Sequence, residues 1–425
     1  MKNLSKFWLI AGVGSSILIV AGISIVMYAR AHTQGANTPS STPVAFQSDA
    51  VATSSSPTVV VSSAVPTTPP APSPATSPIQ KPAPNTSPSP QNNNVTNPNV
   101  STDFTDKLNL KTIQLTGKGT QGLDIDSQTG NIYVGSYAGI SNRCMQGNNQ
   151  GSSYLNVVDP GQGKEVAATP ADPSPIWPMV DNGRGLVYLA SSSGTIGVFK
   201  VDTGERVSQI SVGGLPHQPA ILGNIMVVSN TFDTSETYYS AIDLDTQKVI
   251  DHFPAPHLPH PVIVDSNQKI AYMMGVEKGE VVVIDMTTGQ PKDHFTLEGG
   301  GGQMEISPKF NLAITDSSDP GSSIKIFDLG SKKLLDTVSF PGINTPGGGL
   351  AIDEDDGLLF VTILDANSVG VASLQTHKPL GLFKVGNCPY AVRVDSQRDR
   401  GFVTNTADAT LTQFDLGALK AALPH

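Results

Sequence analysis

The sequence Ile284-Asp285-Met286-Thr287-Thr288-Gly289 is one copy of a segment that recurs seven times along this 425-residue chain. In each copy an apolar or small anchor residue ends a short apolar run, and a turn rich in Asp, Thr, Gly and Lys follows it. The seven anchors are Val158, Phe199, Ile242, Ile284, Phe327, Ala372 and Phe414. Successive anchors are 41, 43, 42, 43, 45 and 42 residues apart. A period of about 40–45 residues that contains only short strands is typical of a β-propeller with one four-stranded blade per repeat.

Each repeat predicts four strands, of which the anchor ends the third. The predicted innermost strands are GLDID, PMVDN, PAILG, PVIVD, QMEIS, GLAID and AVRVD, starting at residues 122, 178, 219, 261, 303, 349 and 391. The predicted second strands are IYVGS, VYLAS, MVVSN, AYMMG, LAITD, LFVTI and GFVTN, starting at residues 132, 187, 226, 271, 312, 359 and 401. Such apolar runs, rich in β-branched and aromatic residues, indicate strands buried between neighbouring blades.

The seventh repeat lacks its outermost strand, because the nine residues after Leu416 do not have the pattern of a strand. Leu108–Leu115 has that pattern and precedes the first repeat. An open sheet edge promotes association with other chains, and closing the ring removes the edge. We therefore predict an all-β, seven-bladed propeller in which this N-terminal strand completes the last blade.

The second strands GFVTN and VYLAS and the Asp-Thr-Gly type of turn resemble those of the YVTN-repeat seven-bladed propellers of bacteria and archaea. The resemblance covers about residues 108–416. It implies the propeller fold and an extracytoplasmic location, but it does not choose among the functions that such rings perform.

The N-terminal residues have a different composition from the repeats. Phe7–Tyr28 contains 22 residues without a charge and follows Lys2 and Lys6, which favours a transmembrane helix with a cytoplasmic N-terminus. A signal peptide cleaved after Ala31 is the alternative, and both predict an extracytoplasmic ring. Residues 33–103 are rich in Pro, Ser, Thr and Asn, which predicts a disordered stalk. The predicted domains are thus 1–32, 33–103 and 104–425.

The predicted ring has 22 basic and 35 acidic residues, a net charge of −13. This acidic balance without a basic stripe argues against nucleic acid as a partner. The chain has two cysteines: Cys144 in the loop between the second and third strands of blade 1, and Cys388 at the entry to blade 7. Because these loops share a face and blades 7 and 1 become neighbours on closure, we predict a Cys144–Cys388 disulfide.

Candidate ligand residues gather in the loops that enter the innermost strands, around the mouth of the channel. His217 enters blade 3, and His257 and His260 enter blade 4. A long loop of blade 3 adds Asp233 and Glu236, while Trp177 enters blade 2 and Tyr390 enters blade 7. Imidazole and carboxylate together suit a divalent metal ion or acid–base chemistry, so His217, His257 and His260 are the candidate metal ligands. Rigid loops whose histidines bond to backbone groups are the alternative.

The sequence contains no Gly-x-Ser-x-Gly, Cys-x-x-Cys-His or His-Glu-x-x-His motif. Asp124, Asp126 and Asn131 lack the spacing of an EF-hand, and we interpret them as turn residues. The favoured function is a membrane-tethered extracytoplasmic module that binds an unidentified protein or small molecule. The alternative is an extracytoplasmic enzyme, a lactonase-like hydrolase or a metal- or cofactor-dependent oxidoreductase, acting at the histidine-bearing face. The sequence alone does not decide between them.

Overall fold

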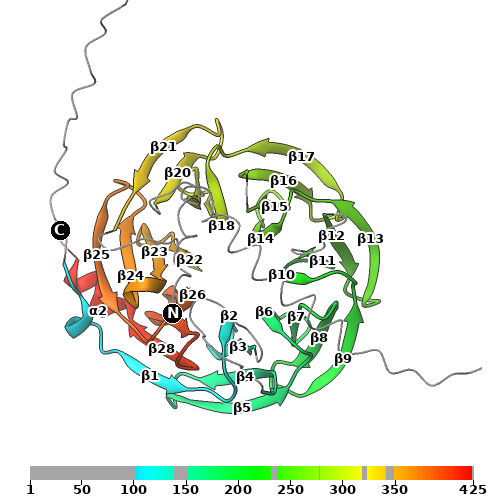
Figure 1. Cartoon of the computed structure of the whole chain (residues 1–425), viewed down its shortest axis with the longest axis horizontal. Coiled ribbons are helices and arrows are strands. Elements are labelled where there is room, and N and C mark those ends of the chain that lie inside the picture. The colour runs from blue at the N-terminus through cyan, green and yellow to red at the C-terminus, as the bar shows by residue number, and fades with distance from the viewer. Residues whose placement is uncertain are drawn as a thin grey trace, which may run out of the picture. The chain divides into compact units, whose positions relative to one another are not determined.

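The computed structural model describes residues 102–137, 151–230, 237–276, 278–317, 323–340 and 349–423. They form a ring of seven four-stranded antiparallel sheets, which confirms the predicted seven-bladed propeller (Figure 1). The predicted apolar span, most of the stalk, and the loop residues Cys144, Asp233 and Glu236 lie outside the described residues, so the predictions made for them are untested. Among the residues that the structure describes, no helix is long and apolar enough to cross a membrane.

The blades follow one another in chain order, each running from an innermost to an outermost strand. Blade 1 is β2 (Thr120–Ile125), β3 (Ile132–Ser136), β4 (Tyr154–Asp159) and β5 (Lys164–Pro170). Blade 2 is β6 (Pro175–Asp181), β7 (Leu186–Ser191), β8 (Thr195–Lys200) and β9 (Arg206–Ser211). Blade 3 is β10 (Pro216–Leu222), β11 (Ile225–Asn230), β12 (Tyr238–Asp243) and β13 (Lys248–Pro254). Blade 4 is β14 (Pro259–Asp265), β15 (Ile270–Gly275), β16 (Glu280–Asp285) and β17 (Pro291–Thr296).

The second half of the ring repeats this order. Blade 5 is β18 (Gly300–Ser307), β19 (Leu312–Ser317), β20 (Ile324–Asp328) and β21 (Leu334–Val338). Blade 6 is β22 (Leu350–Asp353), β23 (Leu358–Ile363), β24 (Ser368–Ser373) and β25 (Pro379–Lys384). Blade 7 is β26 (Pro389–Asp395), β27 (Arg400–Asn405), β28 (Thr410–Asp415) and β1 (Lys111–Gln114). The helices are η1 (Thr105–Lys107), η2 (Leu364–Ala366), η3 (Ser396–Arg398) and α2 (Leu416–Ala422).

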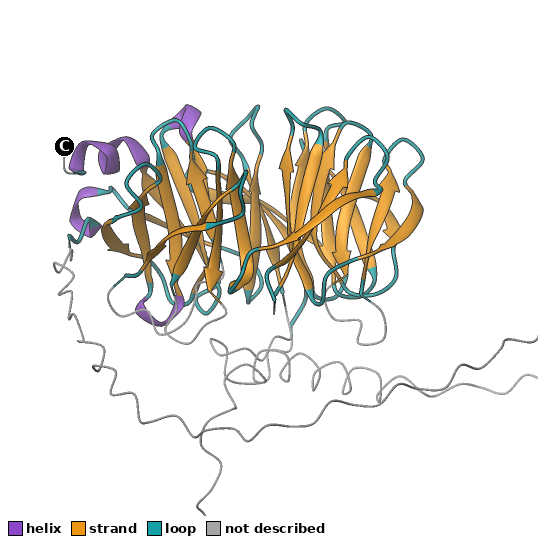
Figure 2. Cartoon of the chain, turned by 90° about the horizontal axis from the view of Figure 1, so that it is seen from above, coloured by secondary structure: helices purple, strands orange, loops and turns teal. Residues whose placement is uncertain are grey.

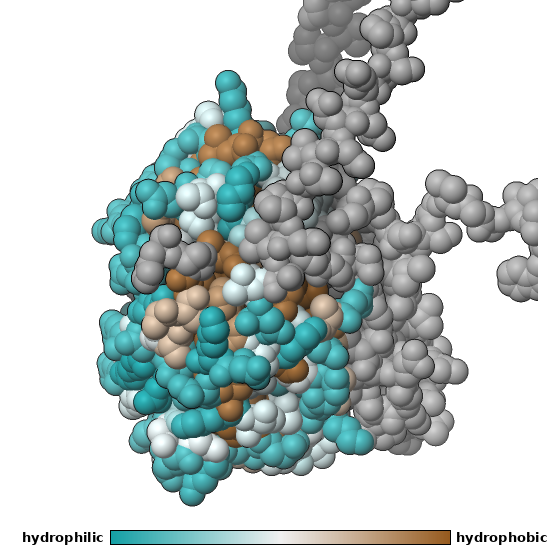
Figure 3. Space-filling view, turned by 90° about the vertical axis from the view of Figure 1, so that its left-hand side faces the viewer, coloured by the Kyte–Doolittle hydropathy of each residue, from teal (hydrophilic) through white to brown (hydrophobic). Residues whose placement is uncertain are grey.

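The core lies between the blades, as the sequence pattern predicts. All seven anchor residues are at most 1 % exposed, because each packs into the interface with a neighbouring blade. The outermost strands instead face solvent and expose single apolar side chains such as Val166 and Ile250. The side view shows the strands stacked around the ring with the loops at its two faces (Figure 2). On the side shown in Figure 3, hydrophobic residues form separate patches among hydrophilic ones.

The N-terminal strand closes the ring, as predicted. β1 pairs antiparallel with β28, from Lys111 opposite Gln413 to Gln114 opposite Thr410. The strand is shorter than the predicted Leu108–Leu115, because the chain before it turns through η1 and buries Phe104 and Leu108 completely. The N–H of Phe104 donates to the carbonyl oxygen of Leu382 in β25 at 2.8 Å. The N-terminal segment therefore joins blades 6 and 7 as well as completing the sheet.

A hydroxyl near the end of several second strands joins adjacent blades. Thr404 Oγ1 accepts from the N–H of Ala391 in its own blade at 3.0 Å and donates to the carbonyl of Gln121 in blade 1 at 2.7 Å. Thr362 Oγ1 likewise accepts from Gly349 N–H and donates to the carbonyl of Tyr390, both at 3.0 Å. The same position thus fixes the spacing of neighbouring innermost strands, which line the channel.

Candidate channel site

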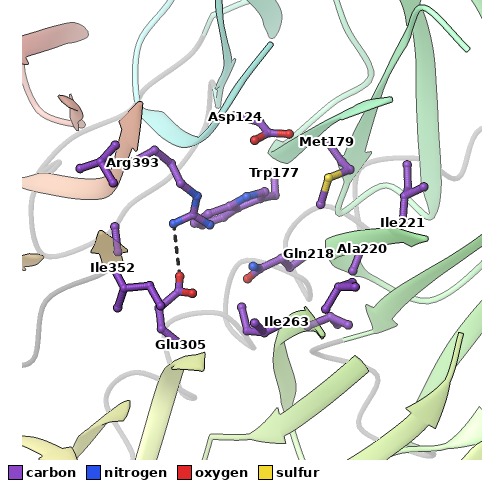
Figure 4. A pocket seen from close by; sticks show the side chains of 14 residues that line it. Asp124, Trp177, Met179, Gln218, Ala220, Ile221, Ile263, Glu305, Ile352 and Arg393 are labelled. Carbon is purple, nitrogen blue, oxygen red and sulfur yellow. Dashed lines mark ion pairs between the residues drawn. The ribbon is translucent and has the colours of Figure 1, made fainter. Parts of the chain in front are cut away.

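The seven innermost strands enclose a cavity of about 360 Å³, and every one of them contributes to its lining (Figure 4). Cavities of this size hold small molecules, and propellers commonly bind ligands on their axis. The lining is mostly apolar with a few polar side chains. It is therefore the candidate site that the structure shows most plainly.

Seven lining residues occupy equivalent positions, one in each innermost strand, and we call them the charged level. They are Asp124, Met179, Ala220, Ile263, Glu305, Ala351 and Arg393. Their cross-strand partners in the second strands are Tyr133, Tyr188, Val227, Tyr272, Ile314, Phe360 and Phe402. Because each partner is the equivalent residue of its own second strand, the seven side chains lie at one height in the channel. Three of these seven side chains are ionisable, whereas a core with only a structural role would consist of apolar side chains.

Arg393 is the only cation at the charged level, and it contacts several groups. Its Nη1 donates to the carbonyl oxygens of Leu350 and Val392 at 3.1 and 3.0 Å. The same atom lies 3.6 Å from Glu305 Oε1 across the channel, and the guanidinium lies 5.2 Å from the centre of the Trp177 ring. Figure 4 shows this pair and the indole facing the same space. The backbone carbonyls and the indole hold the guanidinium in place.

Glu305 accepts no hydrogen bond from the parts of the chain that the structure describes, and its side chain is 15 % exposed. Burial raises the pKa of Glu305 to about 7, although the charge of Arg393 opposes that rise. A carboxyl in an apolar environment favours its neutral form, because ionisation loses the solvation of water. Glu305 therefore changes charge near neutral pH, and any group that donates to it favours the ionised form.

Asp124 has a different environment from Glu305, although both belong to the charged level. Its Oδ2 accepts from the N–H of Val180 at 2.7 Å and its Oδ1 from the N–H of Ile125 at 2.9 Å. Burial raises the pKa of Asp124, and these two hydrogen bonds oppose that rise. Its interpretation as a turn residue is incomplete, because the carboxyl lines the channel while it ties blade 1 to blade 2. Asp126 does serve the turn, since its Oδ1 accepts from Gln128 N–H at 2.8 Å.

Trp177 and Gln218 complete the polar side of the cavity. Trp177 is 2 % exposed and fits against Gly122, where an added Cβ would clash with the indole. Gln218 is 4 % exposed, and its Oε1 has no hydrogen-bond partner within the described residues. A buried acceptor without a donor destabilises the protein, and a bound ligand can supply the missing donor. In Figure 4 the amide of Gln218 points into the cavity.

The structure brings together two of the three predicted metal ligands. The rings of His217 and His260 are 3.7 Å apart between centroids, and Gln303 Nε2 lies 3.0 Å from His260 Nδ1. Burial lowers the pKa of His260 to about 4, and burial and the neighbouring His260 lower the pKa of His217. Both imidazoles are therefore neutral at pH 7. His257 lies exposed on the loop that precedes β14.

The described residues contain no group of three His, Cys, Asp or Glu side chains that could hold a metal ion. Asp233 and Glu236, the predicted partners of the histidines, lie outside those residues. The metal site at His217, His257 and His260 therefore stays a prediction.

Tyr390 is half-buried at the entry to β26, and burial, together with the nearby Asp316, raises its pKa to about 12. Asp316 occupies the position that Thr362 and Thr404 hold in later blades, and its Oδ1 accepts from Gln303 N–H at 2.8 Å. Burial raises the pKa of Asp316 to about 7. A second carboxyl that titrates near neutrality thus lies close to the mouth of the channel.

Sequence reasoning did not single out Glu305, Arg393 and Gln218. The signal was present, because Asp124, Glu305 and Arg393 are each the middle residue of a predicted innermost strand, with an apolar residue on either side: GLDID, QMEIS and AVRVD. Successive side chains of a strand point in opposite directions, so in an innermost strand some of them pack against neighbouring strands and others point into the channel. A charged side chain in such a strand therefore favours the channel side. Only the closed ring shows that Glu305 and Arg393 face one another.

No family model matches the chain, and no curated protein sequence matches it. Among solved structures, the chain is similar to hydrazine synthase of Kuenenia stuttgartiensis, with a TM-score of 0.60 and 13 % sequence identity. The alignment covers 71 % of this chain and 97 % of that chain. At this identity the similarity shows the propeller fold alone. The seven-bladed ring is thus shown, while membership of the YVTN-repeat family stays a prediction.

Proposed function

We propose that this chain is a binding module whose ligand occupies the channel at the charged level. The observation that supports this most directly is the largely buried Glu305–Arg393 pair in a cavity of about 360 Å³. Replacing a buried ion pair by apolar residues is often neutral or stabilising, so such a pair has little value for stability alone. Ionisable groups with a shifted pKa in a cavity are characteristic of functional sites.

The cavity combines the features of a small-molecule site. Apolar residues such as Ile263 and Ile352 supply contact area, while Glu305, Arg393 and Gln218 supply directional contacts. These side chains belong to innermost strands that the packing between blades holds in place, so the site is already formed in the unbound ring.

A fragment screen monitored by thermal unfolding of the full chain tests this function, because a ligand that binds only the folded state raises the melting temperature. We expect hits whose stabilisation disappears in Ala351→Leu, since this substitution places extra methyl groups at the charged level. Ala407→Leu is the matched control, because Ala407 is exposed in the loop between β27 and β28. Stabilisation that persists unchanged in Ala351→Leu would place the ligand elsewhere.

We further propose that the ring lies on the extracytoplasmic side of a membrane, held by the predicted segment Phe7–Tyr28. The support is the length of that uncharged run and the Pro-rich stretch that follows it. Protease digestion of intact spheroplasts followed by carbonate extraction tests this placement. A ring that is protected from protease in intact spheroplasts contradicts it, and a ring released by carbonate favours cleavage after Ala31.

A further inference from the structure

Two acceptors in the cavity, on Glu305 and Gln218, receive no hydrogen bond from the residues that the structure describes. Arg393 Nη1 already donates to two carbonyl oxygens, and its guanidinium lies over Trp177. Among the described residues, Glu305 has an ion pair with Arg393 at 3.6 Å, which is longer than a charge-assisted hydrogen bond of about 2.8 Å. Gln218 Oε1 has no donor within the described residues. Of the two, Glu305 is the acceptor that a ligand in the cavity can reach, because Gln218 Oε1 is buried.

The charges at this level also favour a cation. With both carboxyls ionised, Asp124 and Glu305 carry two negative charges against the single positive charge of Arg393. An anionic ligand would approach these carboxylates in a low-dielectric space, where repulsion between like charges is strong. At a pH at which both carboxyls are ionised, the channel at this level therefore disfavours a carboxylate or phosphate ligand.

The cation that fits is organic rather than a metal ion. Glu305 and Asp124 are the acidic residues of the lining, and no group of three metal-ligating side chains exists within the described residues. The remaining wall is apolar, with Met179, Ile263 and Ile352 around the same space (Figure 4). Such a wall stabilises a bound hydrocarbon group by burying its apolar surface, whereas it offers no oxygen ligands to a hydrated metal ion.

We propose that the channel binds a small organic ammonium ion, whose N–H groups donate to Glu305 and whose hydrocarbon body packs on Ile263 and Ile352. This proposal rests on the proposed function, because it names the chemical class of ligand for the same cavity. Arg393 remains on Trp177 and on its two carbonyls, so the ammonium approaches Glu305 from the side away from the guanidinium.

The proposal has a thermodynamic consequence that a structural role for Glu305 does not have. The ammonium binds the ionised carboxylate, while burial keeps the pKa of Glu305 at about 7 in the unbound ring. Binding near pH 7 therefore releases protons, and affinity falls as the pH drops below 7. The groups that face Glu305 across the cavity are the guanidinium of Arg393 and the carboxyl of Asp124, whose pKa burial also raises.

Isothermal titration calorimetry of the full chain with benzylammonium, benzyl alcohol and phenylacetate tests the proposal. Benzyl alcohol has the same ring without the charge, and phenylacetate has the opposite charge. We expect benzylammonium to bind at least about tenfold more tightly than benzyl alcohol at pH 8, as for a charge-assisted hydrogen bond. Phenylacetate should not bind. Titrations at pH 7 in phosphate and in Tris should differ in apparent enthalpy by the heat of the released protons.

Glu305→Gln is the decisive variant, because glutamine keeps the shape and removes the charge. It should reduce the preference for benzylammonium over benzyl alcohol to within about twofold and abolish the proton release. Glu298→Gln is the matched control, since Glu298 is exposed just before β18 and outside the cavity. It should leave both measurements unchanged.

The outcomes separate this inference from the proposed function. Equal binding of benzylammonium and benzyl alcohol, both lost in Ala351→Leu, overturns the ammonium preference and leaves the channel as a binding site. Binding of phenylacetate instead of benzylammonium overturns the inference in the same way. Benzylammonium affinity that is unaffected in both Glu305→Gln and Ala351→Leu overturns the inference and also places the ligand outside the channel.

Discussion

Replacing Phe104 by alanine should destabilise the ring as a whole, although Phe104 does not line the channel cavity. Phe104 is fully buried, and its core cluster includes Phe383 and Phe414 from blades 6 and 7. Truncation of a fully buried phenylalanine to alanine costs about 3–5 kcal/mol. The hydrogen bond from the backbone N–H of residue 104 to the carbonyl oxygen of Leu382 can persist in the variant, so the loss of stability comes from side-chain packing.

Urea unfolding of the full chain, followed by circular dichroism, measures this loss. Phe104→Ala should lower the midpoint without a large change in slope, because the surface exposed on unfolding is nearly unchanged. Asp106→Ala is the control, since Asp106 is exposed in the same segment and such substitutions change stability by at most about 0.5 kcal/mol. Hydrogen exchange should quicken in β1 and β28 before it quickens elsewhere. A loss below about 1 kcal/mol would refute the role of this segment in ring closure.

Three further outcomes follow from the structure. Thr404→Val removes two hydrogen bonds of a buried hydroxyl, one within blade 7 and one to blade 1, at unchanged shape, so urea unfolding should show a loss of about 1–3 kcal/mol. The pKa of His260 is about 4 in the folded state and about 6.5 in the unfolded state, so protonation favours the unfolded state between these pH values. As the pH falls from 6.5 to 4, the free energy of unfolding of His260→Gln should therefore rise relative to that of the wild type by up to about 3 kcal/mol. Peptide mapping without reductant should recover Cys144 and Cys388 as one linked pair, and alkylation of both thiols in the untreated protein would contradict that bond.

The architecture could be predicted from sequence because its determinants are local and repeated. Each anchor, such as Phe199 or Phe414, ends a third strand and is buried against a neighbouring blade. The closing strand was predictable because the last repeat lacked an outer strand and the first was preceded by one. Its true start at Lys111 was not predictable, because the burial of Phe104 and Leu108 depends on blade 6.

The candidate site was predicted less well, because it depends on contacts across the ring. In the structure Trp177 lines the channel and His217 lies next to His260, while their roles as ligand residues stay predictions. Glu305 and Arg393 are 88 residues apart, and no local pattern shows that two inward-facing charges meet. His257 enters the same blade as His260, yet it is exposed, since three residues along a loop are enough to turn a side chain away.

Photoaffinity labelling of the full chain with a diazirine-substituted benzylammonium tests most directly whether the channel is the binding site. Mass spectrometry of the digested protein locates the label. The account predicts labels on the innermost strands β14 and β22, which carry Ile263 and Ile352, and their loss when benzylammonium competes. Labels confined to the outermost strands, or labels that the competitor does not reduce, would contradict it.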